Sequence, residues 1–180
     1  MIYEAWIDDG YEWVNACDPE DYEVFWRFNG EPLSGSWRPI PVRRVPADAR
    51  SAFRPADFPW LGGHALVMRR TAVDALRDLL ERDGEVLPLS TRDEVDLYVL
   101  NARVIDAMDK ARSVVVMIAG TSRIQYIEHL VLVRSAVEGA DVFRLPHRAS
   151  ATYVSERFVE RVHRAGLVGL VFNKVCESDG

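Results

Sequence analysis

The spacing of apolar and polar residues predicts β structure at the start of the chain. Residues 3–8 alternate between two faces, which is the two-residue period of a strand with one buried side. Asp9-Gly10 then predicts a hairpin turn before a second strand at residues 11–14. Residues 22–28 repeat the alternation, with Tyr22, Val24, Trp26 and Phe28 on one face. The first 30 residues are therefore predicted to form strands.

Two later segments have the period of amphipathic helices. Thr71 predicts the N-cap of a helix with a leucine-rich face, and Gly84 predicts its left-handed C-cap. Ser155 predicts the N-cap of a second helix, which ends at Gly166. Residues 104–111 predict one or two further helical turns. The remaining apolar runs predict strands at 64–69, 85–89, 97–100, 113–119, 124–133, 142–145, 151–154 and 167–175.

Runs of strands interrupted by two clear helices predict an α+β fold with a mainly antiparallel sheet and two principal helices. Residues 29–63 hold six of the nine prolines, which predicts an irregular connection. The predicted organisation is an acidic, aromatic-rich β region with this connection over residues 1–54. An α+β core follows over residues 55–176, and we expect the two parts to form one compact domain.

Composition narrows the class of protein. A chain of 180 residues that is 48% hydrophobic and 28% charged has the composition of an ordinary soluble globular protein. The longest apolar runs have the length of a strand, so no membrane-spanning helix is expected. The chain starts without a basic and apolar leader, and its two cysteines lie far apart in the sequence. We therefore expect a cytoplasmic protein with no membrane partner and no disulfide framework.

The charge is concentrated at one end. Residues 1–30 hold eight acidic residues and one arginine, whereas the other 150 residues hold 20 acidic and 21 basic residues. An acidic end argues against nucleic-acid binding and would suit a basic protein partner; a solvated surface is the alternative. The candidate partner-binding residues are Asp8, Asp9, Glu12, Trp13, Asp18, Glu20, Asp21 and Glu23.

The sequence has no recognisable catalytic constellation. No histidine or cysteine spacing suggests a metal site, and no phosphate or dinucleotide fingerprint appears, so no cofactor is expected. Asp106 and Asp109 would share a face of the predicted helical turns, with Asn101 nearby. These three residues define an alternative, an enzyme of unrecognised type that uses a divalent ion. Capping and hydrogen-bonding roles for these residue types are more common than catalysis.

A series of short motifs in a fixed order resembles a known family. They are Pro55–Pro59, Thr71–Leu80, Gly84–Leu89, Tyr98–Asn101, Asp106–Asp109, Ile127-Glu128, Phe143–Pro146, Val154–Phe158 and Gly166–Phe172. The order resembles bacterial immunity proteins of polymorphic toxin systems, the myxobacterial-type immunity family eleven, long catalogued as a domain of unknown function. The resemblance covers about residues 55–172 and leaves the first 50 residues unmatched.

The resemblance implies a non-catalytic protein that binds and neutralises a cognate toxin encoded nearby and delivered by neighbouring cells. Many such toxins are nucleases, whose basic surfaces an acidic inhibitor could cover. The resemblance supplies no catalytic residues for this chain. The alternatives left open are the enzyme that uses Asn101, Asp106 and Asp109, and a structural or adaptor module. The oligomeric state also stays open.

Overall fold

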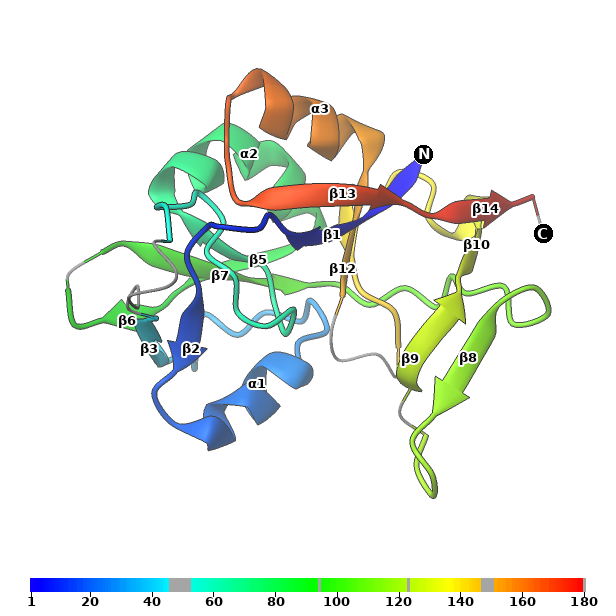
Figure 1. Cartoon of the computed structure of the whole chain (residues 1–180), viewed down its shortest axis with the longest axis horizontal. Helices are drawn as coiled ribbons and strands as arrows, with labels where there is room; N and C mark the ends of the chain where they lie inside the picture. Colours follow the sequence, from blue (N-terminus) through cyan, green and yellow to red (C-terminus); the bar gives the residue numbers. More distant parts are fainter. Residues whose placement is uncertain (46–52, 94, 123, 147–150, 180) are drawn as a thin grey trace.

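The structure of the protein is a computed structural model that describes residues 1–45, 53–93, 95–122, 124–146 and 151–179. Its largest sheet has four antiparallel strands (Figure 1). Their order is β11 (Val142–Phe143), β12 (Thr152–Ser155), β1 (Ile2–Ile7) and β13 (Leu170–Lys174). The first strand of the chain therefore lies between two strands from its C-terminal part.

Four smaller sheets complete the β structure of the described residues. One has the order β4 (Val67–Arg69), β7 (Leu97–Ala102) and β5 (Gly84–Pro88), and another β2 (Val14–Ala16), β3 (Pro41–Arg44) and β6 (Ser90–Thr91). The two-stranded sheets pair β8 (Val114–Met117) with β9 (Ile124–His129), and β10 (Val131–Val133) with β14 (Cys176–Ser178). Only the β3–β6 and β10–β14 pairs among these strands are parallel. The α+β class with mainly antiparallel strands is therefore confirmed.

Three α-helices occur in the described residues: α1 (Tyr22–Trp26), α2 (Arg70–Asp83) and α3 (Glu156–Arg164). Short 3₁₀ helices η1 (Pro19–Asp21) and η2 (Arg134–Ala136) accompany them. The predicted helices correspond to α2 and α3, which lie side by side (Figure 1). Ser155 caps α3 as predicted, because its side-chain oxygen accepts a hydrogen bond from the Phe158 amide at 3.2 Å.

The predicted caps of α2 are wrong at both ends. The helix begins at Arg70, so Thr71 lies in its first turn and donates its hydroxyl hydrogen to Asp57. Gly84 has an extended backbone and starts β5 instead of closing the helix in the left-handed conformation. A Cβ atom at Gly84 would come within 2.4 Å of the carbonyl oxygen of Asn101 on β7. Close approach of two strands therefore accounts for this glycine.

Residues 22–28 were predicted as a strand and instead begin with helix α1. Tyr22, Phe25 and Phe28 are also spaced three residues apart, so the same segment fits one face of a helix. Phe25 and Phe28 are buried on that face, with ring centroids 5.7 Å apart. Burial of the two rings fits the helical period.

Two other local predictions also fail. Residues 104–111 contain no helical turn: Val104 forms a β-bridge to Arg144, and Met108 forms one to Leu132. Gly10 does form a turn with a positive φ of 86°, but β1 and β2 on either side of it do not pair. In both places, backbone partners distant in sequence replace the local structure that was expected.

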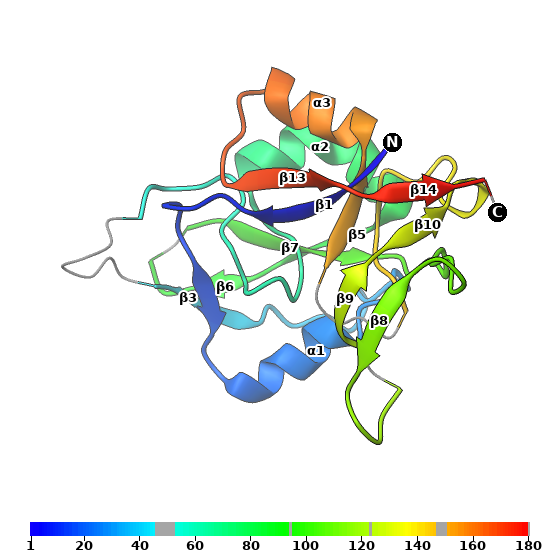
Figure 2. The ribbon, with the colours of Figure 1, turned by 45° about the vertical axis from the view of Figure 1, so that its right-hand side comes forward.

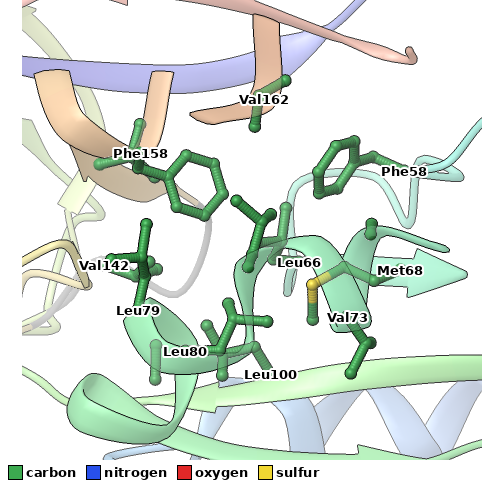
Figure 3. Close-up of a cluster of buried hydrophobic side chains, with 14 of the residues drawn as sticks. Phe58, Leu66, Met68, Val73, Leu79, Leu80, Leu100, Val142, Phe158 and Val162 are labelled. Carbon is green, nitrogen blue, oxygen red and sulfur yellow. The ribbon is translucent and has the colours of Figure 1, made fainter. Parts of the chain in front are cut away.

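The α2–α3 core is the cluster of buried apolar residues between these helices and the strands beneath them (Figure 3). Phe58, Leu79, Val142 and Phe158 are among its members, and Phe158 reaches the centre from α3. Tyr3, Leu170 and Phe172 pack against it from β1 and β13. One face of the largest sheet is therefore covered by α2 and α3.

The α1 core is a second cluster on the opposite side of the molecule (Figure 1). It gathers Phe25 and Phe28 with apolar residues of β2, β3, β4, β5 and β7, such as Val42 and Val99. A third cluster joins Ile2, Leu132, Phe143, Tyr153 and Val175 where β1 meets β10, β11 and β12. The β2–β3 pair reaches β6 through Pro41 and Ser90, so residues before and after residue 54 share a sheet.

The β8–β9 pair confirms the two strands predicted there and projects from the body of the protein (Figure 2). None of the described residues of this hairpin belongs to one of the three clusters. Val114, Met117, Ile118 and Tyr126 expose large parts of their apolar surface.

Candidate functional site

The predicted acidic residues divide into three environments along the chain. Asp8 and Asp9 lie in the turn after β1, whose position is fixed because the Asp8 amide donates to the carbonyl of Gly169 at 3.2 Å. Asp9 is exposed and Asp8 is partly exposed. Neither residue forms an ion pair with another described residue. Their negative charge faces solvent without a salt-bridge partner from that part of the chain.

Glu12 lies inside the protein and is only 5% exposed. Its carboxylate accepts hydrogen bonds from Arg69 and from the Ala56 amide, and lies 3.5 Å from the guanidinium of Arg44. A buried carboxylate needs such partners to offset the loss of hydration. Glu12 therefore ties β2 to the connection and to β4, and it does not contribute to an exposed acidic surface.

The other four acids surround the start of α1. Asp18 caps η1 by accepting a hydrogen bond from the Glu20 amide at 2.9 Å, and Glu23 pairs with Arg27 at 3.2 Å. With Glu20 exposed and Asp21 partly exposed, this group forms the α1 acids: Asp18, Glu20, Asp21 and Glu23. Strand β2 separates the α1 acids from Asp8 and Asp9 (Figure 1). The contiguous acidic stretch of the sequence thus becomes two surface groups around one buried glutamate.

Trp13, the predicted aromatic anchor, is half-buried. Its carbonyl accepts a hydrogen bond from the Val45 amide, and its backbone forms a β-bridge with Trp60. Trp6, which the sequence analysis did not select, is 45% exposed. Strand register distinguishes Trp6 from Trp13. The pairing of β1 with β13 places Trp6 on the sheet face that points away from α2 and α3.

The residues of the enzyme alternative do not converge on a helical face. Asn101 is fully buried. Its side-chain oxygen Oδ1 accepts hydrogen bonds from the backbone amides of Asn29 and Gly30, both at 3.0 Å, and its side-chain Nδ2 donates to the backbone carbonyl of Glu31. Asp106 is exposed and pairs with Lys110 at 3.4 Å. Asp109 accepts from the Ala111 and Arg112 amides and from the Ser178 hydroxyl. These hydrogen bonds lower the pKa of Asp109, the Ser178 hydroxyl contributing most.

The described residues hold no group of three potential metal ligands. His64 is half-buried and accepts a hydrogen bond from the indole N–H of Trp26 at 2.6 Å. Burial and the positive charge of Arg144 lower the pKa of His64. His163 is exposed beside Phe172, and His129 is exposed at the end of β9. His147 lies outside the described residues.

Several buried charges join segments that are distant in sequence, and the sequence analysis gave them no partners. Arg144 donates to the carbonyls of Phe25 at 2.8 Å and Phe28 at 3.4 Å, and burial lowers its pKa to about 10. Asp83 accepts hydrogen bonds from the Asp141 and Val142 amides and pairs with Arg103. No local pattern signals these contacts, because the partners are distant in sequence. They hold chain segments together.

A hollow of about 670 Å³ beside the N-terminus has a charged lining. Arg82 and Arg157 both contact Asp141, and Arg134 lies 3.2 Å from Glu177. These ion pairs neutralise part of the charge in the lining.

Comparison with known proteins gives a family match over 88 of the 180 residues. Residues 90–177 match the model of the immunity protein family (Imm11), which confirms the resemblance seen in the sequence. The motifs from Tyr98 to Phe172 fall within the match, and those before residue 90 lie outside it. The comparison with curated proteins gave no match. Among the described residues, no helix combines the length and apolar character needed to cross a membrane.

Proposed function

Because residues 90–177 match the Imm11 immunity protein family, we propose that this chain binds a cognate toxin stoichiometrically and neutralises it without catalysis. We expect the toxin to be delivered by neighbouring cells, to be encoded nearby and to act in the cytoplasm, where this protein would meet it. A nuclease is the toxin class that suits an acidic inhibitor, since its active site must hold phosphates with basic side chains.

The exposed acids support this proposal with a physical mechanism for association. Asp8, Asp9 and the α1 acids place negative charge on the surface of the N-terminal region. Such a field steers a basic partner and raises its association rate, by an amount that falls as salt is added. Glu12 is excluded from this role because Arg69 and Arg44 hold it in the interior.

The test is a rescue assay with the gene next to the one that encodes this chain. Its C-terminal domain is induced in a susceptible cell, with and without this protein, and the two are then co-purified. Rescue with a one-to-one complex is the expected result. Toxicity that persists in the presence of this protein would contradict the proposal for that partner.

The two acidic groups can be tested separately once a complex exists. One variant carries Asp8→Asn and Asp9→Asn, and a second changes the α1 acids to their amides. If either group steers the toxin, its variant should associate more slowly and show a shallower dependence on salt. Glu138 and Glu160, exposed acids elsewhere on the surface, provide the control when changed to glutamine. Unchanged association rates in both test variants would contradict the steering role while leaving neutralisation intact.

A further inference from the structure

Trp6 is exposed on a part of the largest sheet that no helix covers. It lies opposite Val171 in the register of β1 and β13, and the two side chains are 45% and 38% exposed. Tyr3 and Phe172, on the other face of these strands, pack against the α2–α3 core. On the face of Trp6, the third cluster covers Ile2 and includes Tyr153, which lies opposite Glu4 on β12. An exposed tryptophan with an apolar neighbour is the kind of side chain that anchors protein interfaces.

The Trp6 ring is held in place before any partner arrives. Its centroid lies 5.3 Å from that of Trp60, at an interplanar angle of 56°. Trp60 is itself nearly buried and is fixed to β2 through its bridge to Trp13. A ring supported in this way loses little conformational freedom on binding. Trp6 therefore has the rigidity expected of an anchor.

Negative charge lies beside the Trp6 ring along the strand, where side chains two residues apart point the same way. Asp8 follows Trp6 by two residues, and its hydrogen bond to Gly169 continues the strand pairing. Arg54 lies near this turn, with its guanidinium over the Tyr11 ring at 4.1 Å. Asp8 therefore places on the face of Trp6 a carboxylate that forms no ion pair with another described residue.

We propose that Trp6 anchors the complex by stacking against an arginine on the basic surface of the cognate toxin, with the Asp8 carboxylate accepting hydrogen bonds from its guanidinium. This inference rests on the proposed function and names the main contact between this protein and the toxin. Arginine fits better than lysine, because its planar guanidinium can lie on an indole while its N–H groups point at carboxylates in the same plane. Val171 completes the apolar floor beside the ring.

The experiment measures the dissociation constant for an inactive form of the toxin domain identified in the rescue assay. Trp6→Ala should weaken binding by at least about 30-fold. Trp6→Leu keeps apolar area but has no π face, so it should be nearly as weak, whereas Trp6→Phe should be intermediate. Asp8→Asn should weaken binding by a few fold and flatten its salt dependence. Melting temperatures near that of the wild type would show that each variant is folded.

Tyr126→Ala is the matched control, because Tyr126 is an aromatic residue of similar exposure, 48%, on the separate β8–β9 hairpin. Its binding should stay within about threefold of the wild type. Binding by Trp6→Ala within the same limit would overturn the anchor, and a Trp6→Leu variant that binds like the wild type would overturn the arginine contact. If the wild-type protein neither rescues nor binds, the proposed function itself has failed.

Discussion

The two large cores of this protein are stabilised in different ways. The α2–α3 core consists of hydrocarbon side chains between two helices and the strands below them. In the α1 core a five-residue helix is held by polar groups: Arg144 donates to the carbonyls of Phe25 and Phe28, and Trp26 donates to His64. A helix this short is not stable by itself. The long helices α2 and α3 also share polar contacts, since Arg161 donates to the Ala75 carbonyl and pairs with Asp78. They nevertheless bury a continuous apolar face, whereas the short helix α1 depends more on hydrogen bonds from distant residues.

The largest expected effect comes from opening a cavity in the α2–α3 core. Phe158→Ala should lower the free energy of unfolding by about 3–5 kcal/mol, because Phe158 is fully buried against Phe58 and Phe172. Urea denaturation followed by circular dichroism measures it. His163→Ala, an exposed change on the same helix, should stay within about 0.5 kcal/mol. A small loss for Phe158→Ala would mean that this core can collapse around the missing ring.

A somewhat smaller effect is expected where a polar group positions the segment after α1. Asn101→Leu keeps the volume but leaves the amides of Asn29 and Gly30 and the carbonyl of Glu31 without their partner. Unpaired, partly buried polar groups of this kind should cost about 1–3 kcal/mol in unfolding free energy. Asn173→Leu, an exposed asparagine on β13, is the control. Equal stability of the Asn101→Leu variant and the wild type would contradict the role assigned to this amide.

His64, which accepts a hydrogen bond from Trp26 of α1, also makes the stability of the folded protein depend on pH. The pKa of His64 is lowered in the folded protein, so the unfolded chain takes up a proton at a higher pH than the folded chain does. The stabilisation is therefore complete above about pH 6.5 and is lost as pH falls towards the lowered pKa. His64→Gln can still accept a hydrogen bond from Trp26 but does not take up a proton in this range. The variant should therefore lose less stability than the wild type as pH falls. Melting curves from pH 7.5 to 5 measure it; identical pH profiles for the two proteins would contradict it.

The smallest effect is expected on the surface of α1. Glu23→Gln breaks an exposed pair with Arg27, and such pairs contribute about 0.5 kcal/mol or less to the free energy of unfolding. The same denaturation assay should therefore give nearly the wild-type value. A loss of more than about 1 kcal/mol would show that the polar contacts of the α1 core extend to its solvent side.

The α2–α3 core was the more predictable of the two. Helices α2 and α3 follow from apolar periods that only a helix satisfies, and Ser155 marks the start of one of them. Residues 22–28 fit both a strand and a helix, and the choice depends on Arg144, more than 100 residues away. Local pattern could not separate the two because the deciding hydrogen bonds are tertiary.

The candidate site was predictable as a region and less so by residue. The acidic stretch does place Asp8, Asp9 and the α1 acids on the surface. Glu12 resembles them in sequence but is buried, since its partners Arg69 and Arg44 come from other strands. Exposure of Trp6 likewise depends on pairing with β13, which is more than 160 residues further along the chain. Strand register, which no local spacing reveals, decides which of these side chains face solvent.

The position of β1 also affects when its sheet can form. Of the four strands in this sheet, β1 is the first to be synthesised, yet its neighbours β12 and β13 end at residues 155 and 174. At about 5–20 residues per second, ribosomal synthesis leaves β1 unpaired for roughly 10–30 seconds. Its open edges are exposed to wrong pairing during this time, and Trp6 does not yet have Val171 beside it. Under the proposed function, nascent chains should therefore give no protection, and a cell would need finished copies in reserve before any toxin arrives.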